Sequence, residues 1–384
     1  MTFLAPHIRK VIFKNETLSL KNMALTSIPE PTSHLLGIQK MKKLAVLAAS
    51  LTMLSAGAFA DTTINGAGAT FPYPVYMKWA KEYQSATGVK LNYQAIGSGG
   101  GIKQISAKTV DFGASDAPLS ETQLKKIGLV QFPAVMGSIV PVVNVKGIKA
   151  GELKISGELL ADIYLGKVKY WDDKAVKVDN ASLTLPHQAI VTVHRSDASG
   201  TSFNYTGYLA KVSTDWKEKV GQGKEVVWPK AATNLGGKGN AGVANLVKRT
   251  PGAIGYVEYA YAEQNKLVYT AMKNSAGKFV EPSLETFQAA AANADWNSAP
   301  GFAVDLNNQP GAKSWPMTAA TFILMYKDQA NADNAKEVLK FFEWGYKHGE
   351  LATGLGYVPM PKSVVSMVND MWSKDIKANG KAVY

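Results

Sequence analysis

The stretch of sequence with the most chemical content is Arg195-Ser196-Asp197-Ala198-Ser199-Gly200-Thr201. A guanidinium forms two parallel hydrogen bonds to an oxyanion, and Asp197, two residues beyond Arg195, is placed to hold that guanidinium in one orientation. Ser199, Gly200 and Thr201 supply hydroxyl and N–H groups where a helix is predicted to start, a position that favours anions. The pattern predicts an anion site. The alternative is an ordinary N-cap at Ser199 and a surface ion pair at Arg195.

Two glycine-rich loops have the same predicted context, because each follows a strand and opens a helix. They run from Gly68 to Phe71 and from Gly97 to Gly101. The N–H groups at a helix start have no partner within the helix, and glycine there costs about 1 kcal/mol relative to alanine. Three successive glycines at 99–101 therefore need a reason, and close approach of a ligand to bare backbone is one. A tight turn that requires positive φ is the alternative.

Asp116 follows the predicted strand Phe112-Gly113-Ala114. Taken alone, an aspartate in this place is typical of a helix N-cap. Ser98 and Ser199 are expected to be caps and hydrogen-bond donors. Neither stands in the strand–turn–helix G-x-S-x-G context of a serine nucleophile.

The elements that must position these residues alternate between strands and helices. Residues 63–65 and 89–95 are typical of strands, and the helical face between them carries Tyr76, Trp79, Ala80 and Tyr83, ending at Gly88. This alternation predicts a parallel sheet covered by helices on both faces.

The arrangement repeats later in the chain and predicts a second lobe. A strand at 189–193 precedes a helix through 205–212, and a further amphipathic helix at 338–346 is expected to complete the first lobe. Two apolar runs, Ser138 to Val145 and Ala319 to Tyr326, are the expected crossings between the lobes.

Other chemistries are disfavoured by the sequence. The run Gly237-Lys238-Gly239-Asn240-Ala241-Gly242 matches G-x-G-x-x-G, but the residues before it do not read as an apolar strand, so no dinucleotide cofactor is expected. His187, His194 and His348 show no metal-ligand spacing, so no metal is expected. The chain has no cysteine, which excludes disulfides and a thiol nucleophile.

Composition and charge restrict the class of partner. The chain has 384 residues, 46% hydrophobic and 19% charged, with a formal net charge of +12, which fits two globular lobes. A basic surface steers anions, although scattered lysines that keep the protein soluble are the alternative. Without long blocks of like charge, or basic residues interleaved with aromatic ones, nucleic-acid binding is not expected.

The N-terminal region predicts export. Residues 41–60 carry two lysines, a short apolar run and the sequence Ala58-Phe59-Ala60, which indicates a secretory signal cleaved after Ala60. The apolar run is shorter than the roughly 20 residues that span a bilayer. Translation is expected to start at Met41, so that residues 1–40 are an upstream extension outside the native precursor; a genuine extended leader is the alternative.

Four longer motifs, taken together, resemble one known family. They are Gly66-Ala67-Gly68-Ala69-Thr70-Phe71-Pro72, Asp111-Phe112-Gly113-Ala114-Ser115-Asp116, Arg195-Ser196-Asp197-Ala198-Ser199-Gly200-Thr201-Ser202-Phe203 and Pro251-Gly252-Ala253-Ile254-Gly255-Tyr256-Val257. The sequence from about residue 62 to Tyr384 is similar to the periplasmic phosphate-binding proteins of the phosphate-specific ABC importer. Several long motifs in the right order make this resemblance specific.

The resemblance implies a type II periplasmic binding protein, with two α/β lobes joined by two crossover strands and a ligand cleft between them. Lobe 1 would comprise residues 61–142 and 317–384, and lobe 2 residues 143–316. The implied phosphate-binding residues are Thr70, Phe71, Ser98, Asp116, Arg195, Ser199, Gly200 and Thr201, with Asp197 supporting Arg195. It also implies a monomeric periplasmic protein that catalyses no reaction and delivers phosphate to membrane permease and ATPase subunits.

Asp116 gives this implied site its selectivity. It is the acceptor among groups that otherwise donate, and phosphate at neutral pH still carries a proton to give it, whereas sulfate has none. A site built around a required hydrogen bond rejects the analogue lacking it by about 10⁴ to 10⁵. This favours phosphate over sulfate but does not exclude arsenate. The rival readings are a secreted phosphohydrolase using Ser98 or Ser199, and the same fold carrying sulfate, molybdate or a phosphonate.

Overall fold

The computed structural model describes residues 62–230 and 233–384. The predicted signal at 41–60, its cleavage after Ala60 and the extension at 1–40 lie outside these residues. The strands are β1 Thr63–Gly68, β2 Lys90–Ala95, β3 Phe112–Ser115, β4 Leu129–Val143, β5 Lys154–Ile155, β6 Val191–Arg195, β7 Asn234–Gly237, β8 Ala253–Glu258, β9 Val268–Tyr269, β10 Ala271–Lys273, β11 Phe279–Val280, β12 Thr318–Tyr326, β13 Lys377–Ala378 and β14 Lys381–Ala382. The helices are α2 Tyr73–Thr87, α3 Ser98–Ser106, α4 Glu121–Ile127, α5 Gly157–Tyr164, α6 Lys174–Lys177, α7 Gly200–Val212, α8 Thr214–Lys219, α9 Gly239–Arg249, α10 Tyr259–Asn265, α11 Leu284–Ala291, η1 Pro300–Phe302, α12 Ala332–Lys347, α13 Gly349–Thr353 and α14 Lys362–Asp375.

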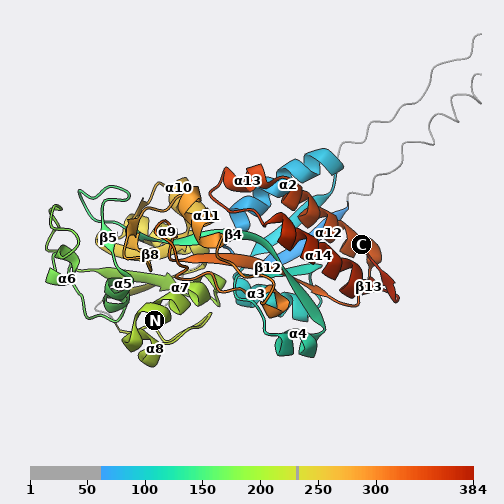
Figure 1. Ribbon diagram of the computed structural model, residues 1–384, viewed down its shortest axis with the longest axis horizontal. Helices are drawn as coiled ribbons and strands as arrows, with labels where there is room; N and C mark the ends of the chain where they lie inside the picture. Colours follow the sequence, from blue (N-terminus) through green and yellow to red (C-terminus); the bar gives the residue numbers. More distant parts are fainter. Residues whose placement is uncertain (1–61, 231–232) are drawn as a thin grey trace, which may run out of the picture. The chain divides into compact units, whose positions relative to one another are not determined.

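The main sheet has the strand order β2-β1-β3-β12-β4-β8-β6-β7, with β9 paired to β4 (Figure 1). One end is parallel, because β1 pairs in parallel with β2 and β3. The other end is parallel too, because β6 pairs in parallel with β7 and β8. The strand–helix alternation in the sequence predicted these two parallel groups, and the structure confirms them.

Two antiparallel strands, β12 and β4, connect the parallel groups. β12 pairs with β3 on one side and with β4 on the other. β4 has 15 residues, all buried; it pairs with β12 from Leu129 to Ser138 and with β8 from Ile139 to Val143. The apolar runs expected to cross between lobes lie largely within these strands. A strand buried on both faces reads as a continuous apolar run, which is the pattern seen in the sequence.

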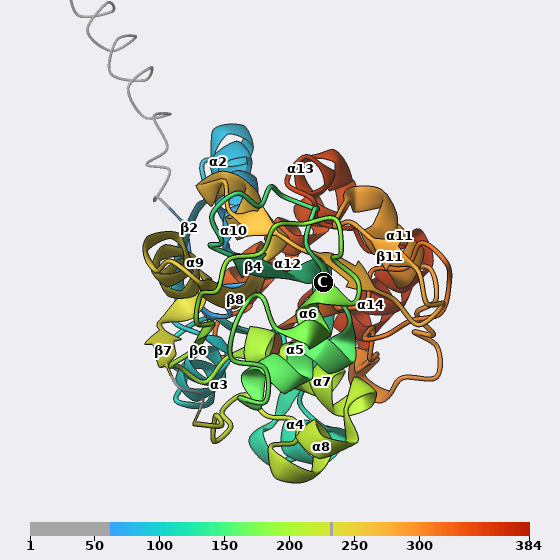
Figure 2. The ribbon, with the colours of Figure 1, turned by 90° about the vertical axis from the view of Figure 1, so that its left-hand side faces the viewer.

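Helices cover both faces of the β6–β8 group. The space beside Gly255 is filled by Val243 and Val247 of α9, while the adjacent Tyr256 stacks on Tyr205 of α7 at 3.9 Å between ring centroids. Since successive side chains of a strand point to opposite faces, α9 and α7 lie on opposite sides of β8 (Figure 2). Around β1–β3, α2 and α12 meet through an aromatic cluster that includes Tyr76, Trp79, Phe341 and Phe342.

Two predicted loops are shorter in the structure than the sequence indicated. β1 continues through Gly68 and α3 begins at Ser98, so Gly99, Gly100 and Gly101 form its first turn. The glycines are needed there because α3 packs directly on strand backbone: a Cβ on Gly101 would lie 2.5 Å from Gly68 Cα. At Gly101, the absence of a side chain therefore makes room for neighbouring main chain and not for a ligand.

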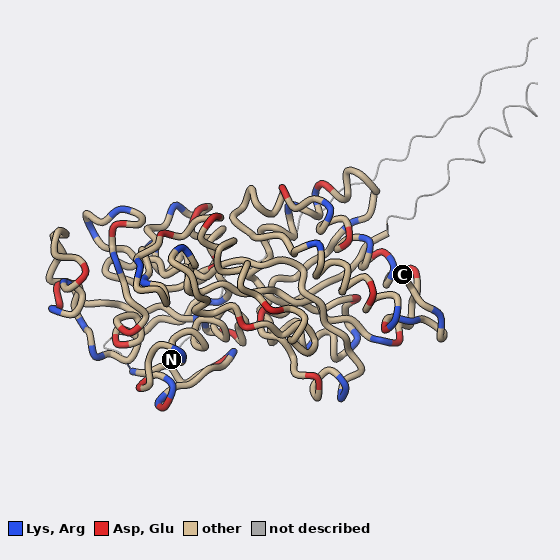
Figure 3. The backbone as a smooth tube through the Cα atoms, in the orientation of Figure 1, with Lys and Arg blue, Asp and Glu red and all other residues tan. Residues whose placement is uncertain are grey.

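Charged residues of both signs are interspersed along the described chain (Figure 3). This matches the sequence, which has no long block of like charge. In residues 62–230 and 233–384, no helix combines the length and the apolar character needed to cross a membrane.

Candidate functional site

The candidate residues from four segments distant in sequence are buried close together. Thr70 and Phe71 lie between β1 and α2, Ser98 opens α3, Asp116 follows β3, and the segment from Arg195 to Thr201 joins β6 to α7. Thr70 and Arg195 are only 6% and 4% exposed, and Asp197 is half-buried. The remaining candidates are at most 1% exposed, namely Phe71, Ser98, Asp116, Ser199 and Thr201. Each of the three helices begins just after a strand, as the sequence predicted.

Ser98 and Gly200 bring the segments into contact. Ser98 Oγ accepts hydrogen bonds from the N–H groups of Asp116 and Gly200, both at 3.1 Å. A Cβ on Gly200 would lie 2.4 Å from Ser98 Oγ and 2.7 Å from Asp116 Oδ2. Position 200 therefore has room for glycine alone while Ser98 and Asp116 keep their positions.

Three hydroxyl groups of the site have the same pattern of hydrogen bonds, in which each oxygen accepts two. Ser98 Oγ accepts the two N–H groups just described; Thr70 Oγ1 accepts the main-chain and side-chain N–H groups of Asn240 at 3.1 and 2.8 Å. Thr201 Oγ1 accepts from Arg195 Nη1 at 3.3 Å and from Asn240 Nδ2 at 3.2 Å. A hydroxyl has two acceptor positions and one proton. With both acceptor positions used, each of these hydroxyls can offer a further ligand only its proton.

Arg195 is held by Asp197 through a two-point contact. Arg195 Nε donates to Asp197 Oδ1 at 2.8 Å, and Nη2 donates to Oδ2 at 2.5 Å. Burial alone would raise the pKa of Asp197, but the hydrogen bonds and charge of Arg195, with a bond from the Gly239 N–H, lower it. The alternative of a surface ion pair at Arg195 is wrong, because its side chain is 1% exposed. Within the described residues, three of the five guanidinium N–H groups are used, which leaves two for a ligand.

Asp116 is the carboxyl group facing this set of donors. Its Oδ1 accepts the Thr321 hydroxyl proton at 2.8 Å. Burial raises the pKa of Asp116 to about 7, although Thr321, Arg195 and Ser98 each act to lower it. Asp116 is not a helix N-cap, the alternative considered from sequence, because Ser120 caps α4. Ser199 is an N-cap, since its Oγ accepts the Ser202 N–H.

Two asparagines that support the site were missed by sequence reasoning. Asn204 Nδ2 donates to the carbonyls of Asp116 and Gly200 and so ties α7 to the end of β3. Asn240, fully buried, joins Thr70 to Thr201. Asn240 lies in the G-x-G-x-x-G match, where β7 leads into α9 although the sequence before the motif shows no apolar strand. β7 is a short, half-exposed strand and so lacks an apolar pattern.

The α3 start and the loop before α7 are in direct contact. Gly99 N–H donates to the Ala198 carbonyl at 2.9 Å. A Cβ on Gly99 would lie 2.3 Å from the Ala198 Cβ, and one on Gly97 would lie 2.3 Å from Asp197 Oδ2. Glycine at these positions lets the two segments close over the site.

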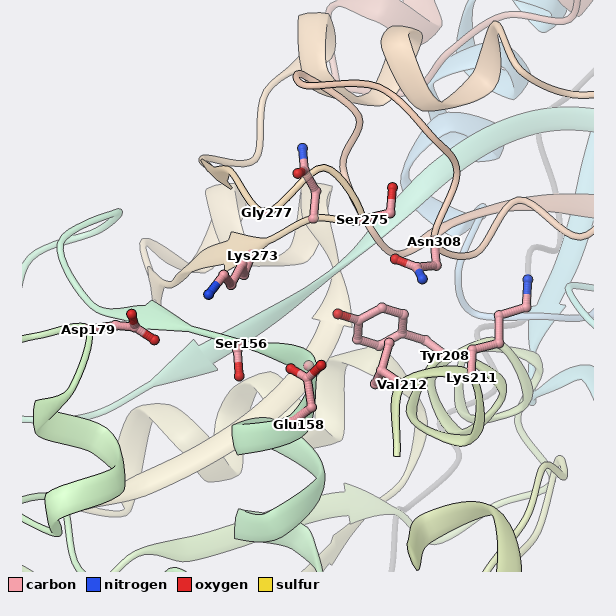
Figure 4. Close-up of a pocket in the computed structure, with 12 residues that line it drawn as sticks. Ser156, Glu158, Asp179, Tyr208, Lys211, Val212, Lys273, Ser275, Gly277 and Asn308 are labelled. Carbon is pink, nitrogen blue, oxygen red and sulfur yellow. The ribbon is translucent and has the colours of Figure 1, made fainter. Parts of the chain in front are cut away.

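A large cavity lies elsewhere in the described chain, and its lining differs in character from the anion-site candidates. It has a volume of about 570 Å³ and is lined by residues of both charge signs, including Glu158, Asp179, Lys211 and Lys273 (Figure 4). It shares no lining residue with the anion-site candidates. Size alone therefore does not identify the site, whereas the convergence of buried donors does. Within residues 62–230 and 233–384, no group of three or more metal-ligating side chains is assembled.

Comparison with known proteins places the chain among binding proteins. Residues 55–344 match the family model described as PBP superfamily domain. The chain is 53% identical over 346 residues to the phosphate-binding protein PstS of Pasteurella multocida, covering 90% of this chain and all of that one. It is 54% identical over 316 residues to the phosphate-binding protein PstS of Haemophilus influenzae, covering 82% and 94% of the two chains.

Solved structures share the fold at lower identity. A phosphate-binding protein from Stenotrophomonas maltophilia matches with a TM-score of 0.65 at 19% identity, covering 83% of this chain and 96% of that one. A high affinity periplasmic phosphate-binding protein, PfluDING, solved with bound phosphate, matches with a TM-score of 0.64 at 21% identity, covering 83% and 96%. These likenesses establish the periplasmic binding protein fold, with two α/β lobes, that the sequence predicted.

Proposed function

Because this chain belongs to the family of phosphate-binding proteins PstS, within the PBP superfamily, we propose that it binds inorganic phosphate with high affinity and delivers it to an ABC importer. The ligand is held between two lobes, residues 61–142 with 317–384 and residues 143–316. The proposed ligand groups are the hydroxyls of Thr70, Ser98, Ser199 and Thr201, the N–H group of Phe71, the main chain at Gly200, the guanidinium of Arg195 and the carboxyl of Asp116.

One observation supports this proposal above the others: the hydroxyls of Thr70, Ser98 and Thr201 each already accept two hydrogen bonds. Thr70 and Thr201 therefore meet a ligand only as donors, together with two N–H groups of Arg195, while the Ser98 hydroxyl also lies beside the Asp116 carboxyl, whose pKa it lowers. A dehydrated anion must exchange its water shell for such fixed donors. A cation or a neutral acceptor-poor ligand would leave these protons unpaired.

Asp116 supplies the selectivity in this proposal. Its carboxylate accepts the proton that phosphate keeps at neutral pH, while sulfate would set its own negative oxygen against a buried carboxylate. The requirement for a proton that the ligand can donate to Asp116 also separates phosphate from molybdate. Arsenate, which has the same protonation chemistry, is expected to bind.

The proposal includes binding without catalysis. Among the described residues, Ser98 Oγ and Ser199 Oγ are hydrogen-bonded to main-chain N–H groups, and neither is bonded to a histidine, the usual base of a serine nucleophile. The relatives are phosphate-binding proteins by name. The expected partners are the permease and ATPase subunits of the importer, and the expected form is a periplasmic monomer cleaved after Ala60.

Calorimetry on protein freed of phosphate tests the proposal. We expect phosphate to bind at micromolar or tighter affinity and sulfate to give no measurable heat at millimolar concentration. Equal binding of the two anions would remove the role of Asp116, and absence of phosphate binding would overturn the function itself. Release of phosphate from p-nitrophenyl phosphate, with and without divalent metals, would establish the phosphohydrolase instead.

A further inference from the structure

Glu258 is a fully buried carboxyl group that the proposed binding mechanism does not use. It ends β8 and caps α10, where its Oε2 accepts the Ala260 N–H at 2.9 Å. Buried glutamates are uncommon unless they are paired with a cation or carry a proton. The contacts of Glu258 distinguish these two cases.

A count of protons around Tyr357 requires one on Glu258. The Tyr357 hydroxyl oxygen lies 2.7 Å from the Phe71 carbonyl oxygen and 2.7 Å from Glu258 Oε2. Both distances are those of hydrogen bonds. A phenol has a single proton, so an ionised Glu258 would leave one of two acceptor pairs without a proton. A proton on Oε2 resolves this, because Glu258 then donates to Tyr357 and Tyr357 donates to Phe71.

The second carboxyl oxygen leads to the same conclusion. Glu258 Oε1 is buried and has no hydrogen-bond partner in the described part of the chain. An ionised carboxylate would place half its charge on this unpaired atom, at a cost of several kcal/mol. In the neutral acid, Oε1 is a carbonyl oxygen, whose burial without a partner costs much less.

The groups around Glu258 also favour the neutral form. Burial raises its pKa well above the ordinary value, and the negative charge of Asp116 raises it further, while Tyr357 and the Ala260 N–H act to lower it. The other titratable groups that interact with it are Tyr259 and Tyr261 on α10. All the side chains named here are acids, so none supplies a compensating positive charge.

Glu258 is connected to the anion site in two directions. Its side chain reaches the Phe71 carbonyl through Tyr357. Its main-chain N–H donates to Asn240 Oδ1 at 2.9 Å, and Asn240 in turn donates to Thr70 and Thr201. The turn at Thr70 and Phe71 is thereby fixed from both sides.

We propose that Glu258 holds a proton at neutral pH and serves as a positioning residue for the phosphate site, donating through Tyr357 to fix the Thr70–Phe71 turn. As a neutral acid it performs this role without adding a second negative charge next to the ligand. The functional part of this inference rests on the proposed phosphate binding; the protonation of Glu258 does not.

Spectroscopy tests the proton directly. Infrared spectra in the Asp116→Asn background, where Asp116 cannot contribute, should show the carbonyl stretch of a protonated carboxyl at pH 8. The band should be absent from the double variant with Glu258→Gln. In the unmutated protein, with glutamate labelled with ¹³C at the carboxyl, one resonance should keep the chemical shift of a buried, protonated carboxyl from pH 6 to pH 8. A Glu258 carboxyl that is ionised at pH 7 would overturn the proposal, and this measurement needs no variant to fold.

Phosphate affinity tests the positioning role. Glu258→Gln keeps the group neutral, but its amide nitrogen cannot both donate to Tyr357 and accept the Ala260 N–H. We therefore expect phosphate binding at pH 7 to weaken by less than about tenfold, whereas removing a nearby negative charge would tighten binding about tenfold or more. Tyr357→Phe breaks the connection to Phe71 and should weaken binding by about tenfold. Tighter binding by Glu258→Gln, or unchanged binding by Tyr357→Phe, would overturn the role. If the unmutated protein binds no phosphate while the protonated carboxyl is present, the proposed function has failed and the protonation stands.

Discussion

Arg195 provides the positive charge of the proposed site, and its removal is the most direct test at the scale of a single residue. In Arg195→Ala, the ligand loses its guanidinium contacts and the half-buried Asp197 loses its partner. Losing one partner of a buried, hydrogen-bonded charge contact costs about 2 to 5 kcal/mol of binding free energy, so we expect phosphate affinity to fall by about thirtyfold or more by calorimetry. Lys211→Ala is the matched control, because Lys211 pairs with the exposed Asp305. Similar losses in both variants would mean that net charge, and not the site, controls affinity.

Asp116→Asn should change selectivity more than affinity. The amide can still accept one hydrogen bond but no longer opposes a fully deprotonated anion, so we expect the ratio of phosphate to sulfate affinity to fall by about a hundredfold or more. Competition between labelled phosphate and unlabelled sulfate measures that ratio. An unchanged ratio would assign discrimination to another group.

Asp116 also predicts how the stability of the phosphate-free protein depends on pH. Its pKa is raised to about 7 in the folded state, above 3.8 in the unfolded chain. Between these values the folded state binds the extra proton, so the free energy of unfolding should fall as pH rises, by at most about 1.4 kcal/mol per pH unit from this group.

Urea unfolding from pH 4.5 to 7.5, in buffer free of phosphate, measures this slope. The slope should be shallower in Asp116→Asn, while Glu258 contributes equally to both proteins and cancels in the difference. Parallel curves for the two proteins would contradict the raised pKa of Asp116.

At the scale of elements, the contact between the start of α3 and the loop before α7 sets whether the site can close. Gly99→Ala would place its Cβ 2.3 Å from that of Ala198. We expect the variant to fold but to bind phosphate at least tenfold more weakly, mainly through faster release measured by stopped flow. Gly354→Ala is the control, since a Cβ there meets only ordinary contacts. An unchanged release rate would show that closure does not need this contact.

Local patterns predicted which elements exist but not where some of them end. The helix face of Tyr76 and Trp79 and its end at Gly88 are visible in sequence, because spacing and left-handed glycine are local properties. The start of α3 at Ser98 was missed because glycine disfavours a helix in isolation, and the packing of Gly101 on Gly68 overrides that preference.

The supporting residues of the site escaped prediction for a related reason. Arg195 and Asp197 are two residues apart, so their contact could be anticipated from spacing. Asn240 contacts Thr70 across 170 residues, and Tyr357 contacts Phe71 across 286 residues and Glu258 across 99. No periodicity encodes such contacts, and they emerge only when the sheet brings the loops together.

At the scale of the whole molecule, ligand binding should increase the free energy of unfolding. A ligand that binds only the folded state raises the free energy of unfolding by about 2.7 kcal/mol at a hundred times its Kd. We therefore expect the Tm to rise with phosphate concentration and to stay constant with sulfate at equal ionic strength, as measured by calorimetric scanning. Equal shifts from both salts would indicate a general salt effect.

The position of β12 has a consequence for how the chain is made. β12 comes from residues 318–326, yet it lies between β3 and β4 in the sheet. Until the ribosome has released almost the entire polypeptide, β3 and β4 lack the neighbour that joins them, and pairings so distant in sequence form slowly. Under the export that residues 41–60 predict, this late pairing would keep the precursor from completing its fold before it crosses the membrane.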